Sequence, residues 1–165
     1  VLRDCISRVN SIAVVHEFLA QQGSGTVDMA AVAQGIYKAV LSGMAAPELR
    51  LTTGFSADNV VIPSEKATSM ALVLNEMLQN CFDHAFTGRT QGAISVELKK
   101  TESGCRLTVC DDGNGLPPGF NGVPQSSLGL RIIKTMAEAD LHGTFKIENR
   151  PQGGTCAEVA IPLGG

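Results

Sequence analysis

Three polar residues follow one another at four-residue intervals near the middle of the chain: Glu76, Asn80 and His84. A helix advances roughly 100° per residue, so residues at this spacing lie on one face. Their neighbours are mostly apolar, which predicts a helix whose polar edge lines a cavity. The amide oxygen of Asn80, together with phosphates, would suit Mg²⁺, and Glu76 could orient or deprotonate a nucleophile beside a terminal phosphate. For this motif alone, a solvated helix edge remains an equal alternative.

A second motif, D-D-G-N-G at residues 111–115, follows the apolar strand pattern of residues 106–110. Gly113 and Gly115 permit positive φ and a close approach of the backbone to a ligand. The carboxylate of Asp111, at the base of a pocket, can accept a hydrogen bond from an exocyclic amine. A plain hairpin turn explains the same residues, so the motif gains weight from its position after the helix motif.

Two later segments complete the set. The S-L-G-L of residues 127–130 opens a helix directly after a loop rich in Gly and Pro. Free N–H groups at such a helix N-terminus form a ready phosphate site. A G-G-T at residues 153–155 precedes an alternating strand. The four segments together predict a pocket that holds a Mg-nucleotide.

These segments, in this order, resemble the ATP-binding domain shared by sensor histidine kinases, gyrase-class topoisomerases, heat-shock chaperones of the ninety-kilodalton class and MutL-type repair proteins. Residues 75–84 look like the N box, 111–115 like the first glycine box, 127–130 like a shortened second glycine box and 153–155 like the final G-G-T. The resemblance covers residues 28 to 163. It is nearest to bacterial sensor histidine kinases of the second dimerisation-domain type, and residues 8–19 resemble the second helix of that subfamily's dimerisation hairpin.

The resemblance implies a role for each motif residue. Asn80 would ligate Mg²⁺, Glu76 would position or activate the attacking group, and Asp111 would accept from the adenine amino group. The other nucleotide contacts would come from Gly113 and Gly115 in the closing loop, Gly129 and the N–H groups near Leu130 at the phosphates, Thr155 on the adenine side, and His84 near the base or phosphates.

The implied function is that of the ATP-binding catalytic domain of a two-component sensor histidine kinase. The domain would transfer the γ-phosphoryl of Mg-ATP to a His on a dimerisation helix of a homodimer, and a response regulator would then take the phosphate onto an Asp. We expect the chain to be a fragment cut before that acceptor His, because it starts with Val1 inside a helical pattern. His16 is expected to be a structural bundle residue, since it lies in an apolar stripe and no Arg-Thr-Pro follows it.

One position departs from the family pattern. Many histidine kinases carry a basic residue three positions after the metal-binding Asn, where this chain has Asp83. A negative charge there disfavours a triphosphate unless the side chain points away. A non-catalytic phosphotransfer adaptor with a decayed nucleotide site is therefore an alternative. A serine kinase of the anti-sigma type, which also uses E-x-x-x-N, is another, although the bundle-like first helix disfavours it.

The predicted elements place these motifs on a layered fold. A helix over residues 2–22 carries one stripe made of Leu2, Ile6, Val9, Ala13, His16 and Ala20, and such a helix needs partners on more than one side. Further helices are predicted over 28–43, with Asp28 as a possible N-cap, 64–86 and 128–139, and strands over 49–55, 59–62, 93–100, 105–110, 143–149 and 155–162. Residues 116–126 are expected to form a mobile lid over the nucleotide.

The predicted fold class is α+β: a two-layer α/β sandwich of the histidine kinase ATPase type, with helices on one face of a mixed sheet. We expect residues 1–23 to be a partial dimerisation and histidine-phosphotransfer helix, and residues 26–165 to be the ATP-binding catalytic domain. The length of 165 residues suits one domain plus a short appendage.

Composition excludes several partners. A net charge of −3 argues against a nucleic-acid surface, which needs clustered Lys and Arg. No apolar run of about 18 residues predicts a transmembrane helix, and we expect no signal peptide and no membrane segment in this fragment. The five scattered cysteines are Cys5, Cys81, Cys105, Cys110 and Cys156. We expect them to be buried reduced thiols of a cytoplasmic protein. We expect no zinc site, because the sequence has no C-x-x-C motif.

Overall fold

The computed structural model describes residues 2–22, 25–44, 46–121 and 127–163. Its helices are α1 (Leu2–Gln22), α2 (Met29–Met44), α3 (Ser64–Asn80) and α4 (Leu128–Thr135), and α3 and α4 continue into the π-helical turns η1 (Cys81–Ala85) and η2 (Met136–Asp140). Its strands are β1 (Thr26–Asp28), β2 (Arg50–Ala57), β3 (Val61–Pro63), β4 (Gln91–Lys100), β5 (Gly104–Asp111), β6 (Thr144–Asn149) and β7 (Thr155–Pro162).

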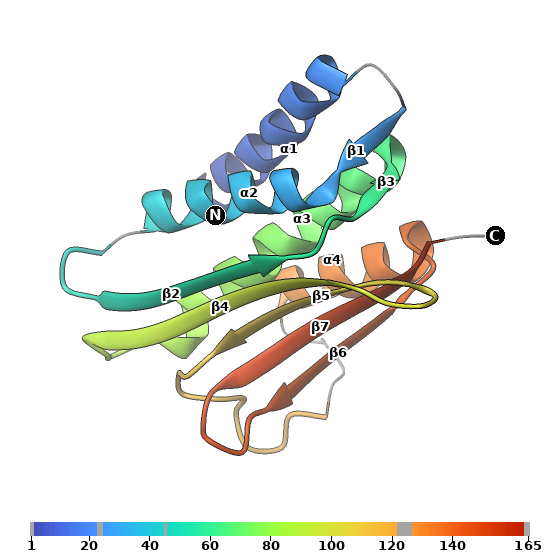
Figure 1. Ribbon diagram of the computed structural model, residues 1–165. Helices are drawn as coiled ribbons and strands as arrows, with labels where there is room; N and C mark the ends of the chain where they lie inside the picture. The colour runs from blue at the N-terminus through green and yellow to red at the C-terminus, as the bar shows by residue number, and fades with distance from the viewer. Residues whose placement is uncertain (1, 23–24, 45, 122–126, 164–165) are drawn as a thin grey trace.

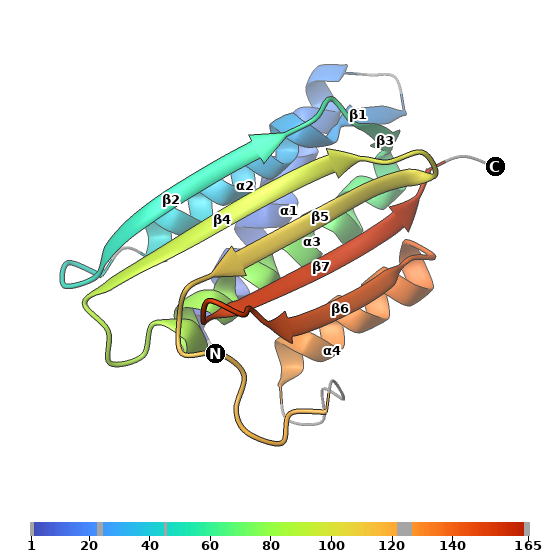
Figure 2. The same ribbon diagram turned by 60° about the horizontal axis from the view of Figure 1, so that its bottom comes forward.

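Five strands form one mixed sheet in the order β2-β4-β5-β7-β6. The β2–β4 pair is parallel and the other three pairs are antiparallel. A parallel pair needs a long crossover, which here runs through β3 and α3. The helices α2, α3 and α4 cover one face of the sheet (Figure 1), and Figure 2 shows the opposite face with the helices behind it. The predicted α+β class, with helices on one face of a mixed sheet, is confirmed.

Alternation along the strands builds the core between sheet and helices. In β4, Ile94, Val96 and Leu98 are at most 2% exposed, and the residues between them are more exposed. The same period of two recurs in β5 and β7, as expected when one sheet face is covered. Leu74 of α3 and Ile133 of α4 are fully buried on the helical side. The core thereby holds the motif helices α3 and α4 against one face of the sheet.

The first helix forms an outer layer. α1 packs on α2 and α3 rather than on the sheet (Figure 1). Its contact with them includes Ser11, which is 3% exposed, whereas the predicted apolar stripe faces outward. Leu2 is 76% exposed, Ile6 53% and Val9 63%, and His16 is exposed as well. No helix within the described residues is long and apolar enough to cross a membrane.

The predicted elements are recovered, with informative differences at their ends. Asp28 caps α2 as predicted, because its carboxylate accepts hydrogen bonds from the N–H groups of Ala30 (3.0 Å) and Ala31 (3.4 Å). The preceding residues, however, form strand β1 against β3. The motif helix is α-helical only to Asn80 and then widens into a π turn. Of the predicted lid, residues 122–126 lie outside the described residues.

The expectation of five buried, reduced thiols is wrong at three positions. Cys110 and Cys156 are joined by a disulfide, and Cys5 is exposed, while Cys81 and Cys105 are buried free thiols. The two bonded cysteines are 46 residues apart in sequence but directly opposite each other in β5 and β7, with Cα atoms 4.2 Å apart. Spacing along the chain carries no sign of this proximity, because it depends on strand order and register.

Candidate functional site

A cavity of about 620 Å³ lies between α3 and η1 on one side and β5, β7 and β6 on the other. The start of α4 and the loop over residues 114–120 complete its wall. Most of the lining is apolar, including Met77, Val109 and Ile147, with a few polar side chains among them. This volume and lining are typical of a site for a small organic ligand.

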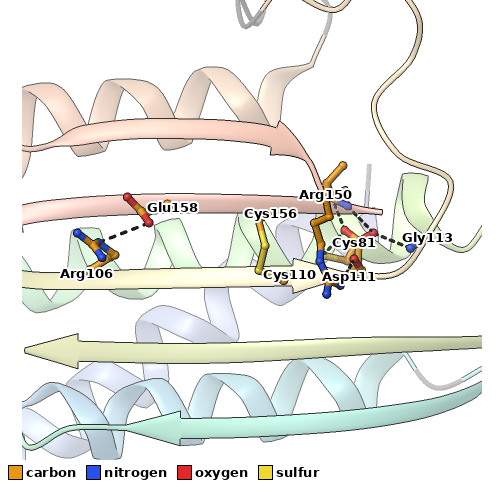
Figure 3. Close-up of a disulfide and its surroundings, with 9 residues drawn as sticks. Cys81, Arg106, Cys110, Asp111, Gly113, Arg150, Cys156 and Glu158 are labelled. Atoms are coloured by element: carbon orange, nitrogen blue, oxygen red, sulfur yellow. Dashed lines mark hydrogen bonds and ion pairs between the residues drawn. A yellow bond between two sulfur atoms is a disulfide. The ribbon is translucent and has the colours of Figure 1, made fainter. Parts of the chain in front are cut away.

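Asp111 stands at the base of the cavity, at the end of β5, and is 1% exposed. Its Oδ1 accepts hydrogen bonds from the N–H groups of Gly113 (2.8 Å) and Thr155 (3.2 Å). Its Oδ2 accepts from the Thr155 hydroxyl and from the Cys81 thiol (3.6 Å). Figure 3 shows Asp111 with Cys81, Gly113 and Arg150 beside it. The side chain is thereby held in one orientation, and the sequence-predicted residues Asp111, Gly113 and Thr155 are brought together.

Two glycines let the backbone close around Asp111. A Cβ at Gly113 would overlap the backbone and side chain of Ala85, at the end of η1. A Cβ at Gly154 would overlap the carbonyl oxygen of Asp111, and φ at Gly154 is +82°, a conformation that favours glycine. The sequence reasoning gave no individual role to Gly154, although it stands in the G-G-T that was identified.

Two further contacts were missed by sequence reasoning. The Arg150 guanidinium donates to the Asp111 carbonyl oxygen (2.8 Å), and Asn149 Oδ1 accepts from the N–H of Leu116 (2.7 Å). Gly115, with φ at +79°, turns the chain beside Asn149. Both polar residues lie at the end of β6, where no motif marks them, so only strand order reveals their position.

A second polar group forms where α3 meets the start of α4. A Cβ at Gly129 would lie 3.1 Å from both Asn80 Oδ1 and Glu76 Oε2. These two oxygens therefore converge on the first turn of α4, with Glu76 only 2% exposed. Ser127 caps α4, its hydroxyl accepting from the N–H of Leu130 (3.5 Å). Asn80, Ser127 and Leu130 line the cavity.

Asp83 and His84 of η1 differ in whether they line the cavity. His84 is exposed and lines the cavity, whereas Asp83 is exposed and is not among the lining residues. Asn80 and His84 both line the cavity, although the chain changes from α-helix to a π turn between them. The carboxylate of Asp83 is therefore not part of the cavity wall.

Cys81 adds a thiol beside the buried carboxylate. Burial raises the pKa of this thiol well above its ordinary value, and the negative charge of Asp111 together with its hydrogen bond raises the pKa further. The protonated thiol donates to Asp111 and lies within 3.4 Å of the Met77 carbonyl oxygen. The thiol thus acts as a neutral hydrogen-bond donor.

Comparison with known proteins agrees with this geometry. Residues 65–165 match the family described as histidine kinase-, DNA gyrase B- and HSP90-like ATPase. The sensor histidine kinase PdtaS of Mycolicibacterium smegmatis is 30% identical over 164 residues, which cover 99% of this chain and 33% of that protein. The blue-light-activated histidine kinase 2 of Erythrobacter litoralis is 34% identical over 112 residues, 65% of this chain and 31% of that protein. The chain thus spans about a third of the length of these relatives.

Solved structures give the same answer. The histidine kinase domain of the blue-light-activated kinase EL346 of Erythrobacter litoralis superposes with a TM-score of 0.87 at 25% identity, covering 97% of this chain and 75% of that one. The ATP-binding domain of PrrB from Mycobacterium tuberculosis shares the fold, with a TM-score of 0.57 at 22% identity over 85% of this chain and 97% of that one. The chain therefore belongs to the histidine kinase-, DNA gyrase B- and HSP90-like ATPase family, as a domain of the sensor histidine kinase type.

Proposed function

We propose that this chain is the ATP-binding catalytic domain of a two-component sensor histidine kinase, and that it transfers the γ-phosphoryl of Mg-ATP to a histidine. The observation that carries the proposal is that Asp111 and Asn80 line one cavity of about 620 Å³, and that the amide oxygen of Asn80 converges with the buried Glu76 carboxylate on Gly129. The first group suits a purine base, and the second suits phosphates and a divalent cation.

Asp111 would read the adenine amino group. Its carboxylate accepts four hydrogen bonds, from the Gly113 N–H, the Thr155 N–H and hydroxyl, and the Cys81 thiol, which fill the about four acceptor positions of an ionised carboxylate. An exocyclic amine would therefore replace the longest of them, from the Cys81 thiol at 3.6 Å. The apolar lining at Met77 and Ile147 would cover the faces of the ring. Gly113 and Gly115 would allow the loop to follow the nucleotide closely, and Thr155 would support the same edge of the base.

Asn80 would hold Mg²⁺, and the donor set fits this ion. Its amide oxygen and the nearby Glu76 oxygen are hard ligands, and Mg²⁺ is commonly held by one or two protein groups plus phosphates. Within the described residues there is no group of three or more His, Cys, Asp or Glu able to hold a metal, and a shell of this kind needs none. The bound ion would neutralise charge developing on the phosphates. Glu76 would orient or deprotonate the attacking group.

The start of α4 would receive the phosphates. Gly129 carries no side chain, so phosphate oxygens could approach the N–H groups of the first turn of α4. The Leu130 N–H, which donates to the Ser127 hydroxyl in this structure, would exchange that partner for phosphate. His84, exposed at the rim of the cavity, would add a further donor to the base or the phosphates. The loop over residues 116–121 lies on the same cavity and would cover the bound nucleotide.

The outer helix would supply the assembly. In this proposal residues 1–23 belong to a dimerisation hairpin, and residues 26–165 form the catalytic domain. The exposed apolar stripe of α1 would pair with a second copy of the chain, and the acceptor histidine would lie on a dimerisation helix. A response regulator would then receive the phosphate on an Asp. The reaction would take place in the cytoplasm.

The alternative of a non-catalytic adaptor loses its main motivation, because Asp83 is exposed and lies outside the cavity lining.

To test the kinase proposal, the chain is incubated with Mg-ATP labelled at the γ-phosphate and a separate acceptor-helix hairpin. We expect acid-labile phosphohistidine on the hairpin, loss of it in Glu76→Gln, and its retention in the matched control Asp83→Asn. Acid-stable phosphoserine on a partner would favour the serine kinase instead. No transfer at saturating nucleotide to a competent acceptor would reject the proposal.

A further inference from the structure

The disulfide between Cys110 and Cys156 lies on the sheet face that points away from the cavity. Val109 and Ala157 line the cavity, and side chains alternate along a strand, so the adjacent cysteines face the opposite way. Both cysteines are partly exposed there, on the same face of the sheet as the Arg106–Glu158 ion pair drawn in Figure 3. Small thiols and disulfides in solution can therefore reach the bond.

Each cysteine is the direct chain neighbour of a residue in the proposed adenine site. Cys110 precedes Asp111, and Cys156 follows Thr155. The Thr155 N–H and hydroxyl both donate to the Asp111 carboxylate, so the bond fixes the spacing of two residues that already contact each other. A change at the sulfurs is thus one residue away from Asp111 on β5 and one residue away from Thr155 on β7.

The bond also closes the end of a ladder. The β5–β7 register runs from Gly104 opposite Pro162 to Cys110 opposite Cys156, which is its last pair at the cavity end. Ends of ladders open locally more easily than their centres. Without the cross-link, this end would be held by ordinary strand pairing and by the hydrogen bonds to Asp111.

We propose that Cys110 and Cys156 form a reversible thiol–disulfide exchange site, and that its oxidation state sets how firmly Asp111 and Thr155 are held for the nucleotide. The effect on nucleotide affinity rests on the proposed function, whereas the exchange itself does not. The oxidised chain holds the carboxylate in its binding orientation, and the reduced chain must order it on binding, which weakens affinity.

The chemistry needs only a low-molecular-weight disulfide as oxidant. One cysteine thiolate attacks a sulfur of that disulfide, forms a mixed disulfide and expels one thiolate. The second cysteine thiolate then attacks the protein sulfur of the mixed disulfide and expels the other. The two protons lost by the cysteines end on the two released thiols. The cysteine pair is oxidised by two electrons, and the external disulfide is reduced by the same two.

The remaining cysteines are poor candidates for this exchange. Cys81 and Cys105 are buried, and burial raises the pKa of Cys81 well above its usual value and that of Cys105 to about 11. Their thiols are therefore protonated at neutral pH, and the thiolate is the reacting form. Cys5 is exposed on α1 and can form a mixed disulfide with an external disulfide, but the other two free cysteines are buried, so it has no second reactive thiol with which to close a protein disulfide. A redox response of the isolated domain is consequently assigned to Cys110 and Cys156.

The test compares the whole chain equilibrated with oxidised glutathione and with dithiothreitol. Thiols are counted by alkylation after denaturation, with peptide mapping. We expect two alkylated cysteines in the oxidised chain, the buried Cys81 and Cys105, with glutathione on the exposed Cys5, and all five alkylated in the reduced chain. Reduction opens a loop of 46 residues and should lower the melting temperature by at least about 5 °C. The dissociation constant of a non-hydrolysable Mg-ATP analogue should rise at least about threefold.

Two variants sharpen the result. Cys156→Ser should bind the analogue like the reduced chain in either condition, whereas Cys5→Ser should keep the full redox response. Alkylation of Cys110 and Cys156 under oxidising conditions, or an unchanged melting temperature, would overturn the exchange site. Equal dissociation constants in the two states, with the bond verified by mapping, would overturn its effect on the nucleotide. Absence of binding in both states would reject the proposed function, and thiol count and melting temperature would still decide the exchange site.

Discussion

Gly129 is the position where the smallest possible side chain would disturb the proposed metal and phosphate group. A methyl group there would lie 3.1 Å from Asn80 Oδ1 and from Glu76 Oε2 and would occupy the space for phosphate. We expect Gly129→Ala to weaken binding of a Mg-ATP analogue by roughly tenfold or more, or about 1.4 kcal/mol. The control is Gly43→Ala, where an added methyl meets nothing within 4 Å. Equal affinities in the two variants, measured by calorimetry, would contradict the placement of phosphate at Gly129.

Cys81 offers a pH-dependent reporter of the cavity. Because burial, and after it Asp111, raises the pKa of this thiol, the reactive thiolate forms only at pH well above the ordinary range. Its alkylation by iodoacetamide should therefore stay slow near neutral pH, increase only as pH rises through the raised pKa, and slow further when nucleotide is bound. Alkylation at pH 8, followed by peptide mass spectrometry, should modify the exposed Cys5 first. Equal rates at the two cysteines would show that Cys81 is not held as described.

At the residue scale, the motif residues could be singled out from the sequence, but the residues that hold them in place could not. Asp111, Gly113 and Thr155 were predicted as site residues, and the structure brings them into hydrogen-bonding contact. Arg150 and the disulfide partner of Cys110 were not predicted. Their contacts depend on which strands are neighbours and in what register, and a single sequence does not encode this in any short pattern.

Among the elements, α1 and α3 are joined by a buried polar chain that ends at the proposed catalytic carboxylate. The Ser11 hydroxyl donates to Asn75 Oδ1 (2.9 Å), and Asn75 Nδ2 lies 3.4 Å from Glu76 Oε1. All three side chains are at most 3% exposed. The outer helix thereby contacts Asn75, the residue next to Glu76. A displacement of α1 would therefore disturb the hydrogen bonds that lead to the Glu76 carboxylate.

Removing the Ser11 hydroxyl tests this connection. We expect Ser11→Ala to lower the free energy of unfolding by roughly 1–3 kcal/mol, because a buried amide oxygen loses a donor. Urea unfolding measures the change. Ser56→Ala, on the exposed edge strand β2, should change it by less than about 0.5 kcal/mol. If the two variants were equally stable, the Ser11–Asn75 contact would contribute nothing to holding α1.

The types of the elements were predictable because the periodicity of apolar residues was clear. The positions at which elements end were harder to predict. Strands β4 and β5 follow the alternation read from sequence, and the Asp28 cap was recognised by residue type. The end of α3 was not, since the π turn of η1 arises where the helix meets the loop after β5: Asn114 N–H donates to the Ala85 carbonyl oxygen (2.9 Å). Such tertiary contacts override the helical period.

On the scale of the whole molecule, the exposed stripe of α1 is the surface that a second copy would cover. Leu2, Ile6 and Val9 are each more than half exposed and follow one helical face. We expect the chain to show concentration-dependent dimerisation in sedimentation velocity and Val9→Glu to abolish it without changing nucleotide affinity. Val61→Glu is a matched control, because Val61 is 57% exposed but lies on β3. Dimerisation that survives Val9→Glu would locate the interface elsewhere.

A calorimetric titration of the chain with a non-hydrolysable ATP analogue, with and without Mg²⁺, decides whether this cavity is the nucleotide site. We expect saturable, Mg²⁺-dependent binding, and we expect its loss in Asp111→Asn and in Asn80→Asp, with a melting temperature in each variant that shows a retained fold. No binding up to millimolar nucleotide, or normal binding by both variants, would contradict the assignment of this cavity as the nucleotide site.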